Sequence, residues 1–290
     1  MDSTDGETVL SEAVTAYQTA LGNRLISAYA LGSLAHGGFS SLVSDIDLGL
    51  IISDPLQPDD PVKIQTVAET EKTKGPELHA RLSVFWGTPS TLRGEIPGGR
   101  FPALDRLDLF EHGRLLVGID NIRDSLPRPS LNELTVTSAN FALDFLSDVK
   151  PLAASGNDTF ASARFDGHEA LKEILAPDLL VSRDVRRVTK LVLFPVRFLY
   201  TAKTGHVGTN DFSANHYLTD DRAPGRDLVA AALVWRTSEE FDKAAARDLL
   251  ARQIVPLYLY YIDDHITRLE ALGQDRLATW FRHWRERIQD

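Results

Sequence analysis

The stretch Leu31–Ile52, LGSLAHGGFSSLVSDIDLGLII, decides the fold. Its second half, DIDLGLII, alternates between a face that carries Asp45 and Asp47 and a face that is wholly aliphatic, which is the pattern of a half-buried strand. The two acids then point the same way, with Cα atoms about 6.5–7 Å apart. Burial of the aliphatic face turns these acids toward a cleft.

A pair of carboxylates at this spacing favours a divalent cation. Two such charges about 4 Å apart repel by roughly 4 kcal/mol at an effective dielectric of 20, and a cation between them removes that cost. A lone D-x-D is more often a solvated strand edge, so the metal prediction depends on the motifs around the pair. With those motifs, the pattern predicts one or two metal ions held by Asp45 and Asp47.

A glycine- and serine-rich turn precedes the acids. Gly32 and Ser33 end an apolar strand and open a short helix, whose backbone N–H groups and Ser33 hydroxyl are suited to phosphate oxygens. Ser44 is placed to anchor the entry to the second strand. A phosphate cradle that faces a metal-binding acid pair is what nucleotidyl transfer requires, because the metals neutralise the triphosphate and activate the attacking oxygen.

The sequence pattern differs between the first and the second half of the chain. We expect helices over 8–24, 62–74 and 102–111, and strands over 25–31, 45–52, 81–86 and 114–117. LPRPS at 126–130 is typical of a linker and SGNDT at 155–159 of a loop, and beyond the linker nearly every segment has helical periodicity. The pattern predicts an α/β (α+β) domain over 1–125 and an all-helical domain over 126–290.

The amino-acid composition excludes several kinds of functional site and disfavours one class of partner. The 290 residues include no cysteine, which excludes a disulfide framework, a cysteine nucleophile and a thiolate metal site. A net charge of −10 argues against extended, sequence-indifferent nucleic-acid binding, although it is compatible with a local basic groove. The acidic first residues lack a signal-peptide pattern, and no window approaches 18 uncharged apolar residues. We therefore expect a soluble, cytoplasmic protein without a membrane partner.

The motifs resemble those of a known superfamily. Gly32-Ser33, Gly37-Gly38 and Ser44–Leu48 are similar to the GS-x-x-x-GG…SDIDL pattern of DNA polymerase β-type nucleotidyltransferases, most of all the aminoglycoside (streptomycin/spectinomycin) adenylyltransferases. RFLYTAKTG at Arg197–Gly205 resembles their R-x-x-Y-x-A-x-T-G segment. The resemblance implies a mixed sheet with flanking helices, two Mg²⁺ ions at Asp45 and Asp47, ATP against Gly32-Ser33, and a helical domain that holds the acceptor.

Two positions depart from that pattern. The family carries a third carboxylate on the next strand, where alternation here places Arg81 and Ser83 on the acid face. A lysine that follows the family's Thr-Gly pair is Asn210 in this chain. The side chains that flank the strand and are candidates for the missing group are Glu77, His79, Asp105, Asp108 and Glu111.

Basic residues of the helical domain give weaker signals. Arg183, Arg186, Arg187 and Lys190 are spaced to share one helix face, which is either a solvated surface or a wall for a triphosphate. Arg197 lies inside the apolar run LVLFPVRFLY, so it must find a carboxylate, a carbonyl or a ligand phosphate. We expect Lys190 and Arg197 to join Gly32, Ser33 and Ser44 in nucleotide binding.

These observations predict a Mg²⁺-dependent nucleotidyltransferase. It would move a nucleoside monophosphate, AMP from ATP foremost, onto a hydroxyl of a small-molecule, aminoglycoside-like acceptor, and antibiotic resistance would be the consequence. The acidic net charge favours a cationic acceptor. Two alternatives remain. One is the same chemistry on a macromolecule, an RNA 3′ end or a protein side chain; the other is a non-catalytic nucleotide-binding module, which the missing acid favours.

Overall fold

The computed structural model describes residues 3–75, 77–149, 167–238 and 240–290, and the structural statements that follow concern those residues. The chain divides into two compact units, Met1–Pro129 and Ser130–Asp290, and the division falls inside the LPRPS stretch. The expected loop SGNDT at 155–159 lies outside the described residues. No helix in the described ranges is long and apolar enough to cross a membrane.

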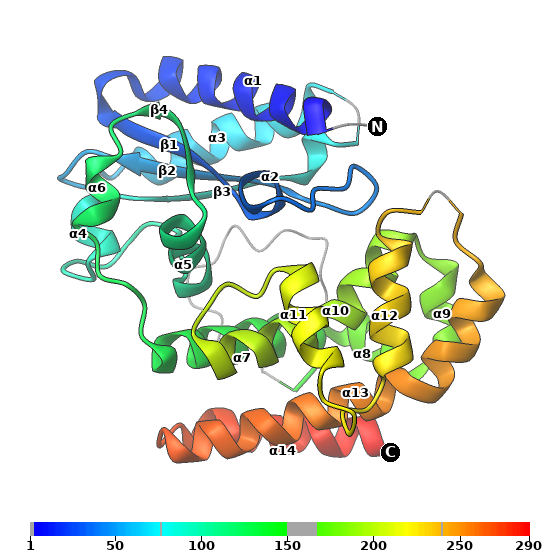
Figure 1. Cartoon of the computed structure of the whole chain (residues 1–290). Helices are drawn as coiled ribbons and strands as arrows, with labels where there is room; N and C mark the ends of the chain where they lie inside the picture. The colour runs from blue at the N-terminus through cyan, green and yellow to red at the C-terminus, as the bar shows by residue number, and fades with distance from the viewer. Residues whose placement is uncertain (1–2, 76, 150–166, 239) are drawn as a thin grey trace. The chain divides into compact units, whose positions relative to one another are not determined.

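The first unit is built on a four-stranded mixed sheet (Figure 1). Its central strand β1 (Leu25–Leu31) pairs antiparallel with β2 (Ile46–Ile52) and with β4 (Arg114–Gly118), while β2 pairs parallel with β3 (Leu82–Gly87). The strand order is therefore β3-β2-β1-β4. The mixed sheet is confirmed, and each strand lies within one residue of its predicted range.

Helices α1 (Ser3–Leu21) and α3 (Asp60–Thr73) cover one face of the sheet (Figure 1). Ile46 and Leu48 of β2 are fully buried in this layer, together with Leu82 and Val84 of β3. The predicted alternation of both strands is thus confirmed. Helix α1 begins earlier than the expected residue 8, and the 3₁₀ turn η1 (Gly22–Arg24) joins it to β1.

The opposite face carries a smaller apolar core, which α5 (Ala103–Glu111) covers. The buried side chains of this core are Tyr29, Leu31, Ile51, Phe85, Leu92, Leu109 and Leu126. The short helices α4 (Pro89–Leu92) and α6 (Asn121–Asp124) complete the described helices between β3 and the unit boundary. Because side chains alternate along a strand, Asp47 of β2 and Ser83 of β3 belong to this face.

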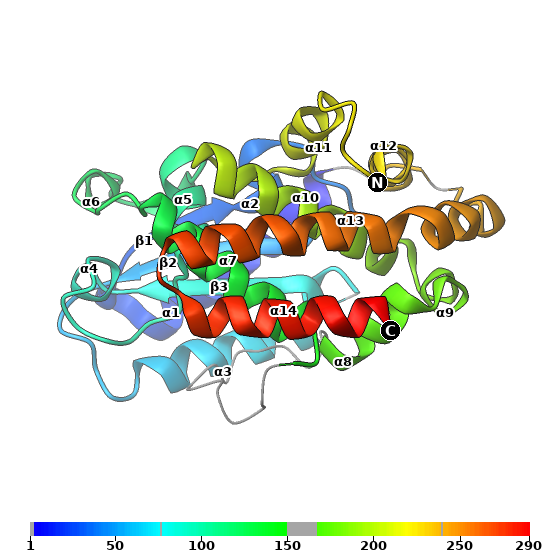
Figure 2. The ribbon, with the colours of Figure 1, turned by 90° about the horizontal axis from the view of Figure 1, so that it is seen from below.

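The second unit is helical throughout its described residues. Its helices are α7 (Leu131–Leu146), α8 (Gly167–Leu175), α9 (Pro177–Ser182), α10 (Val185–Thr204), α11 (Asn210–Leu218), α12 (Arg226–Trp235), α13 (Lys243–Ala271) and α14 (Asp275–Gln289). A capping box between Ser130 and Glu133 starts α7 directly after the boundary. The last two helices of the chain, α13 and α14, pack side by side (Figure 2). The all-helical character predicted for this part is therefore observed.

Candidate functional site

The two acids of the D-I-D motif lie at the start of β2. Asp47 pairs in register with Leu31 of β1 on one side and with Ser83 of β3 on the other. Asp45 comes one residue before the strand, and both acids are half-buried. Alternation directs Asp47 to the face of the sheet that α5 covers, and Asp45 lies immediately before the strand.

The Gly-Ser motif contacts the acid motif directly. Gly32 joins β1 to the short helix α2 (Gly32–His36) with φ of +60°, a conformation that favours glycine. A Cβ built at Gly32 would overlap a carboxylate oxygen of Asp47, whose Cγ is 3.2 Å from that position. The missing side chain at residue 32 is therefore what allows the Asp47 carboxylate to lie against the turn.

A second carboxylate approaches Gly32 from the helix that covers this face. The Gly32 N–H donates a hydrogen bond of 2.5 Å to Oδ2 of Asp108, which lies on α5 and is only 8% exposed. The N–H that was expected to bind phosphate is thus engaged with an acid in this structure. Asp108 was one of several candidates in the sequence, and the fold singles it out by this contact.

Strand β3 brings a serine, and not an acid, to the site. Ser83 stands beside Asp47 in the parallel register. Arg81 precedes the strand in the 3₁₀ turn η2 (His79–Arg81), where its guanidinium donates to the Ser41 carbonyl at 2.7 Å and pairs with Glu77 at 2.5 Å. The expectation that Arg81 lies on the strand is wrong, because the chain is still turning at that residue. Arg81 supports the loop before β2 instead.

Three of the other candidates for the missing acid, Glu77, His79 and Glu111, have partners elsewhere. Glu111 pairs with Arg128, and His79 lies 2.9 Å from a carboxylate oxygen of Glu12 on α1. Because α1 covers the aliphatic face of the sheet, His79 belongs to the layer opposite Asp47. Asp108 is accordingly the candidate that the fold brings to the Gly32 turn.

Two more side chains shape the surroundings of the turn. The buried Ser44 hydroxyl accepts the Ser40 N–H at 3.0 Å, which anchors the strand entry as expected. The ring of His36, at the end of α2, lies edge-on to the ring of His112 with centroids 5.3 Å apart. His112 follows α5 by one residue, and it went unnoticed in the sequence because its contact is with a residue distant in the chain.

The donor chemistry of the acid pair suits Mg²⁺. Carboxylate oxygens are its preferred protein ligands, and Mg²⁺ is commonly held by one or two carboxylates together with substrate phosphates. In the described part of the chain, no three His, Cys, Asp or Glu side chains lie close enough to bind one metal ion by themselves. The residues present therefore fit an ion that Asp45 and Asp47 share with a nucleotide, and not a dedicated protein cage.

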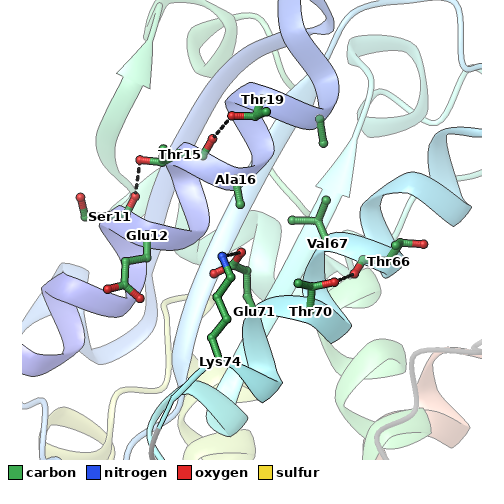
Figure 3. A pocket seen from close by; sticks show the side chains of 11 residues that line it. Ser11, Glu12, Thr15, Ala16, Thr19, Thr66, Val67, Thr70, Glu71 and Lys74 are labelled. Atoms are coloured by element: carbon green, nitrogen blue, oxygen red, sulfur yellow. Dashed lines mark hydrogen bonds and ion pairs between the residues drawn. The ribbon is translucent and has the colours of Figure 1, made fainter.

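A groove of about 600 Å³ lies elsewhere on the first unit, between α1 and α3 (Figure 3). Small and hydroxyl-bearing side chains line most of it, and Glu71, which is 2% exposed, pairs with Lys74 at 2.5 Å at one end. Because α1 and α3 cover the face opposite Asp47, this groove is separate from the acid pair.

The residues of the predicted basic face, Arg183 to Lys190, include two that form ion pairs with acids of the second unit. Glu173, only 1% exposed, accepts hydrogen bonds of 2.7 Å from Arg183 and 2.6 Å from Arg187. Arg183 also precedes α10, so it does not share a helix face with Lys190, and that prediction is wrong. Two of the four residues of the expected basic face, Arg183 and Arg187, therefore belong to an internal ion-pair network. Lys190 itself is half-buried on α10.

Arg197 has found one of the partners that its apolar surroundings require. Its Nε donates to the Gly208 carbonyl at 2.5 Å, just beyond the segment that resembles R-x-x-Y-x-A-x-T-G. Gly205 ends α10 in the left-handed region, with φ of +72°, so the glycine of that segment is a helix cap. The first residue of the next helix, α11, is Asn210, where the family carries lysine.

A buried arginine, Arg236, lies close enough to the half-buried Arg197 for their charges to interact. Arg236, at the end of α12, is 4% exposed and approaches Asp211 to 3.9 Å. Burial lowers the pKa of its guanidinium; Asp211 opposes that shift, and the charge of Arg197 adds to it. The sequence gave no signal for Arg236, because it is 39 residues from Arg197 and lies at the edge of an apolar helix.

Comparison by sequence and comparison by fold give different results for this chain. No protein-family model matches the chain, and no curated protein matches it. Among solved structures it is similar to spectinomycin adenyltransferase AAD(9) from Enterococcus faecialis with ATP and spectinomycin, at 14% identity and a TM-score of 0.51. The match covers 84% of this chain and 98% of that one. The chain therefore shares the fold of this adenyltransferase, a mixed sheet with flanking helices followed by a helical region.

Proposed function

We propose that the chain is a Mg²⁺-dependent nucleotidyltransferase that transfers a nucleoside monophosphate, AMP from ATP foremost, to a hydroxyl of a small-molecule, aminoglycoside-like acceptor in the cytoplasm. The observation that carries the proposal is the contact between the Gly32 turn and the Asp47 carboxylate. This contact brings a turn suited to phosphate binding next to an acid pair suited to metal binding. The fold that carries both is shared with an adenyltransferase.

Each residue of the proposed site has a separate task. Asp45 and Asp47 hold Mg²⁺, which supplies neutralisation of the triphosphate charge. Ser33, at the start of α2, orients the phosphates, and Ser44 keeps the strand entry in place. Within the second unit, Lys190 and Arg197 stay candidates for nucleotide binding, and the charge of Arg197 acts on Arg236.

The transfer is an in-line exchange of one bond for another. The acceptor oxygen bonds to the α-phosphorus, the bond from that phosphorus to the bridging oxygen breaks, and pyrophosphate leaves. The hydroxyl proton passes to an amine of the acceptor or to water, since β3 offers Ser83 and no acid. General-base assistance contributes about 10²–10⁴-fold, so we expect slow turnover.

A small cationic acceptor fits the charge of the chain. The net charge of −10 attracts cations and repels polyanions such as RNA. Two of the four basic residues that would have supported a nucleic-acid acceptor, Arg183 and Arg187, are engaged with buried Glu173. The similar solved structure contains spectinomycin, which makes this compound and streptomycin the first acceptors to test.

Transfer of label from α-³²P-ATP tests the proposal. The full chain is incubated with Mg²⁺, labelled ATP and each acceptor, and both pyrophosphate and the labelled acceptor are measured. We expect both products in equal amounts, and neither from Asp47→Asn. Strand β3 carries Ser83 beside Asp47, where the family that the sequence resembles carries an acid. This difference favours a second candidate function, a non-catalytic nucleotide-binding module. Mg²⁺-dependent ATP binding without product from any acceptor would establish that module instead.

A further inference from the structure

Asp108 differs from the other acids near the site because its carboxylate reaches a backbone atom of the Gly-Ser motif. It lies on α5 between Leu107 and Leu109, both of which are fully buried, so its backbone is held by the core. Its Oδ2 accepts the Gly32 N–H at 2.5 Å. A hydrogen bond from a backbone N–H to a carboxylate is about twice as strong as a bond between neutral groups.

The Asp47 carboxylate lies against the same glycine. The Cβ position of Gly32 is 3.2 Å from Cγ of Asp47, while the N–H of Gly32 is directed to Asp108. Nitrogen and Cβ are substituents of one Cα, so the two carboxylates lie within about 8 Å of each other on either side of one residue. A rotation of the Gly32 peptide would change both contacts together.

We propose that Asp108 is a positioning residue for the Asp45–Asp47 pair. By accepting the Gly32 N–H it fixes the turn at φ +60°, and this turn is what gives the Asp47 carboxylate its place. The inference rests on the proposed function, since it assigns Asp108 a part in metal–nucleotide binding by that site. It places Asp108 behind the ligands, in agreement with the lack of a three-residue metal cluster in the described ranges.

Two substitutions separate the hydrogen bond from the charge. Asp108→Asn keeps an acceptor oxygen at the same reach and removes the charge, whereas Asp108→Ala removes the acceptor. Asp108→Ser, which is one bond too short to reach Gly32, replaces the alanine variant if that variant does not fold. Asp124→Ala, at an exposed acid of α6, is the matched control.

The full chain is examined by amide hydrogen exchange at Gly32 and by titration with Mn²⁺ in the presence of ATP. We expect Gly32 to be protected in the wild type and in Asp108→Asn, and to exchange at least about tenfold faster in Asp108→Ala. Loss of a residue that orients a metal ligand costs about 10–100-fold in affinity, so the alanine variant should bind Mn²⁺ that much more weakly. The asparagine variant and the control should stay within about fivefold of the wild type.

The outcomes are distinct. Equal Mn²⁺ affinity in the wild type and in Asp108→Ala overturns the inference and leaves the proposed function standing. A loss in Asp108→Asn as large as that in Asp108→Ala also overturns it, because the charge and not the hydrogen bond would then be responsible. If the wild type binds no Mn²⁺ with ATP, the proposed function fails, and the inference fails with it.

Discussion

The two faces of β2 are made from alternate residues of one short strand, yet they are used differently. One face presents Ile46 and Leu48, fully buried under α1 and α3. The other presents Asp47, half-buried, between the Gly32 turn and Ser83. Burial of the first face orients the second, because a one-residue slip would exchange them. The acid pair is therefore positioned by an aliphatic core that it does not touch.

The largest effect expected from this contrast is on the acid face. Asp45→Asn and Asp47→Asn should each lower transfer by about 10²–10³-fold, the usual cost of losing one group that stabilises charge in the transition state. The melting temperature should stay near the wild-type value because no apolar area is lost. Pyrophosphate release with the true acceptor measures the effect. Wild-type turnover in either variant would refute the site assignment.

The aliphatic face should respond in the opposite way. Ile46→Asn and Leu48→Asn should each lower the free energy of unfolding by roughly 2–4 kcal/mol, through lost burial and an unsatisfied amide. Urea denaturation of the two variants measures the loss, and Asp47→Asn on the same strand is the control. A free energy of unfolding equal to that of the wild type would mean that these side chains are not in the core.

A smaller effect is expected where β3 meets the acid face. Ser83→Glu places a carboxylate beside Asp47 in the parallel register, and we expect it to raise turnover by about tenfold, which is less than the 10²–10⁴-fold that a well-positioned general base contributes. Turnover against Mg²⁺ concentration is the measurement. Arg81→Glu is the contrast: it breaks the contacts with Ser41 and Glu77 and should only destabilise the chain. A loss of activity in a folded Ser83→Glu variant would show that the serine already has a positive role.

Sequence patterns predicted the strands well because alternation and flanking glycines are local signals. They also identified Gly32 and Asp47, since both motifs lie within one short stretch. The Asp108–Gly32 hydrogen bond joins residues 76 apart, and helical periodicity assigns a face to Asp108 without naming its neighbour. Arg197 shows the same limit, because its apolar surroundings required a partner but did not identify the Gly208 carbonyl. Pairings between distant elements become visible only in the folded chain.

The smallest predicted effect concerns an ionisable side chain that, unlike Asp47, is fully buried. His265 of α13 is 0% exposed, and its ring stacks on Phe281 at an interplanar angle of 10°. Burial lowers its pKa, although Asp264, whose Oδ2 lies 3.4 Å from Nδ1, opposes the shift, while Arg268 adds to it. The folded chain therefore keeps this histidine neutral at pH values where the unfolded chain binds a proton.

Stability from this group is present above the unfolded pKa of about 6.5 and is lost as the pH falls below it. Between pH 7 and pH 5.5 the wild type should lose stability through this group, by at most about 1.4 kcal/mol per pH unit, because at most one proton per molecule is taken up on unfolding. His265→Phe keeps the aromatic packing and should remove this part of the pH dependence. Urea denaturation at both pH values measures it, with exposed His283→Gln as the control. If His265→Phe loses as much stability as the wild type on acidification, a different group is responsible and the buried ring is not the one that titrates.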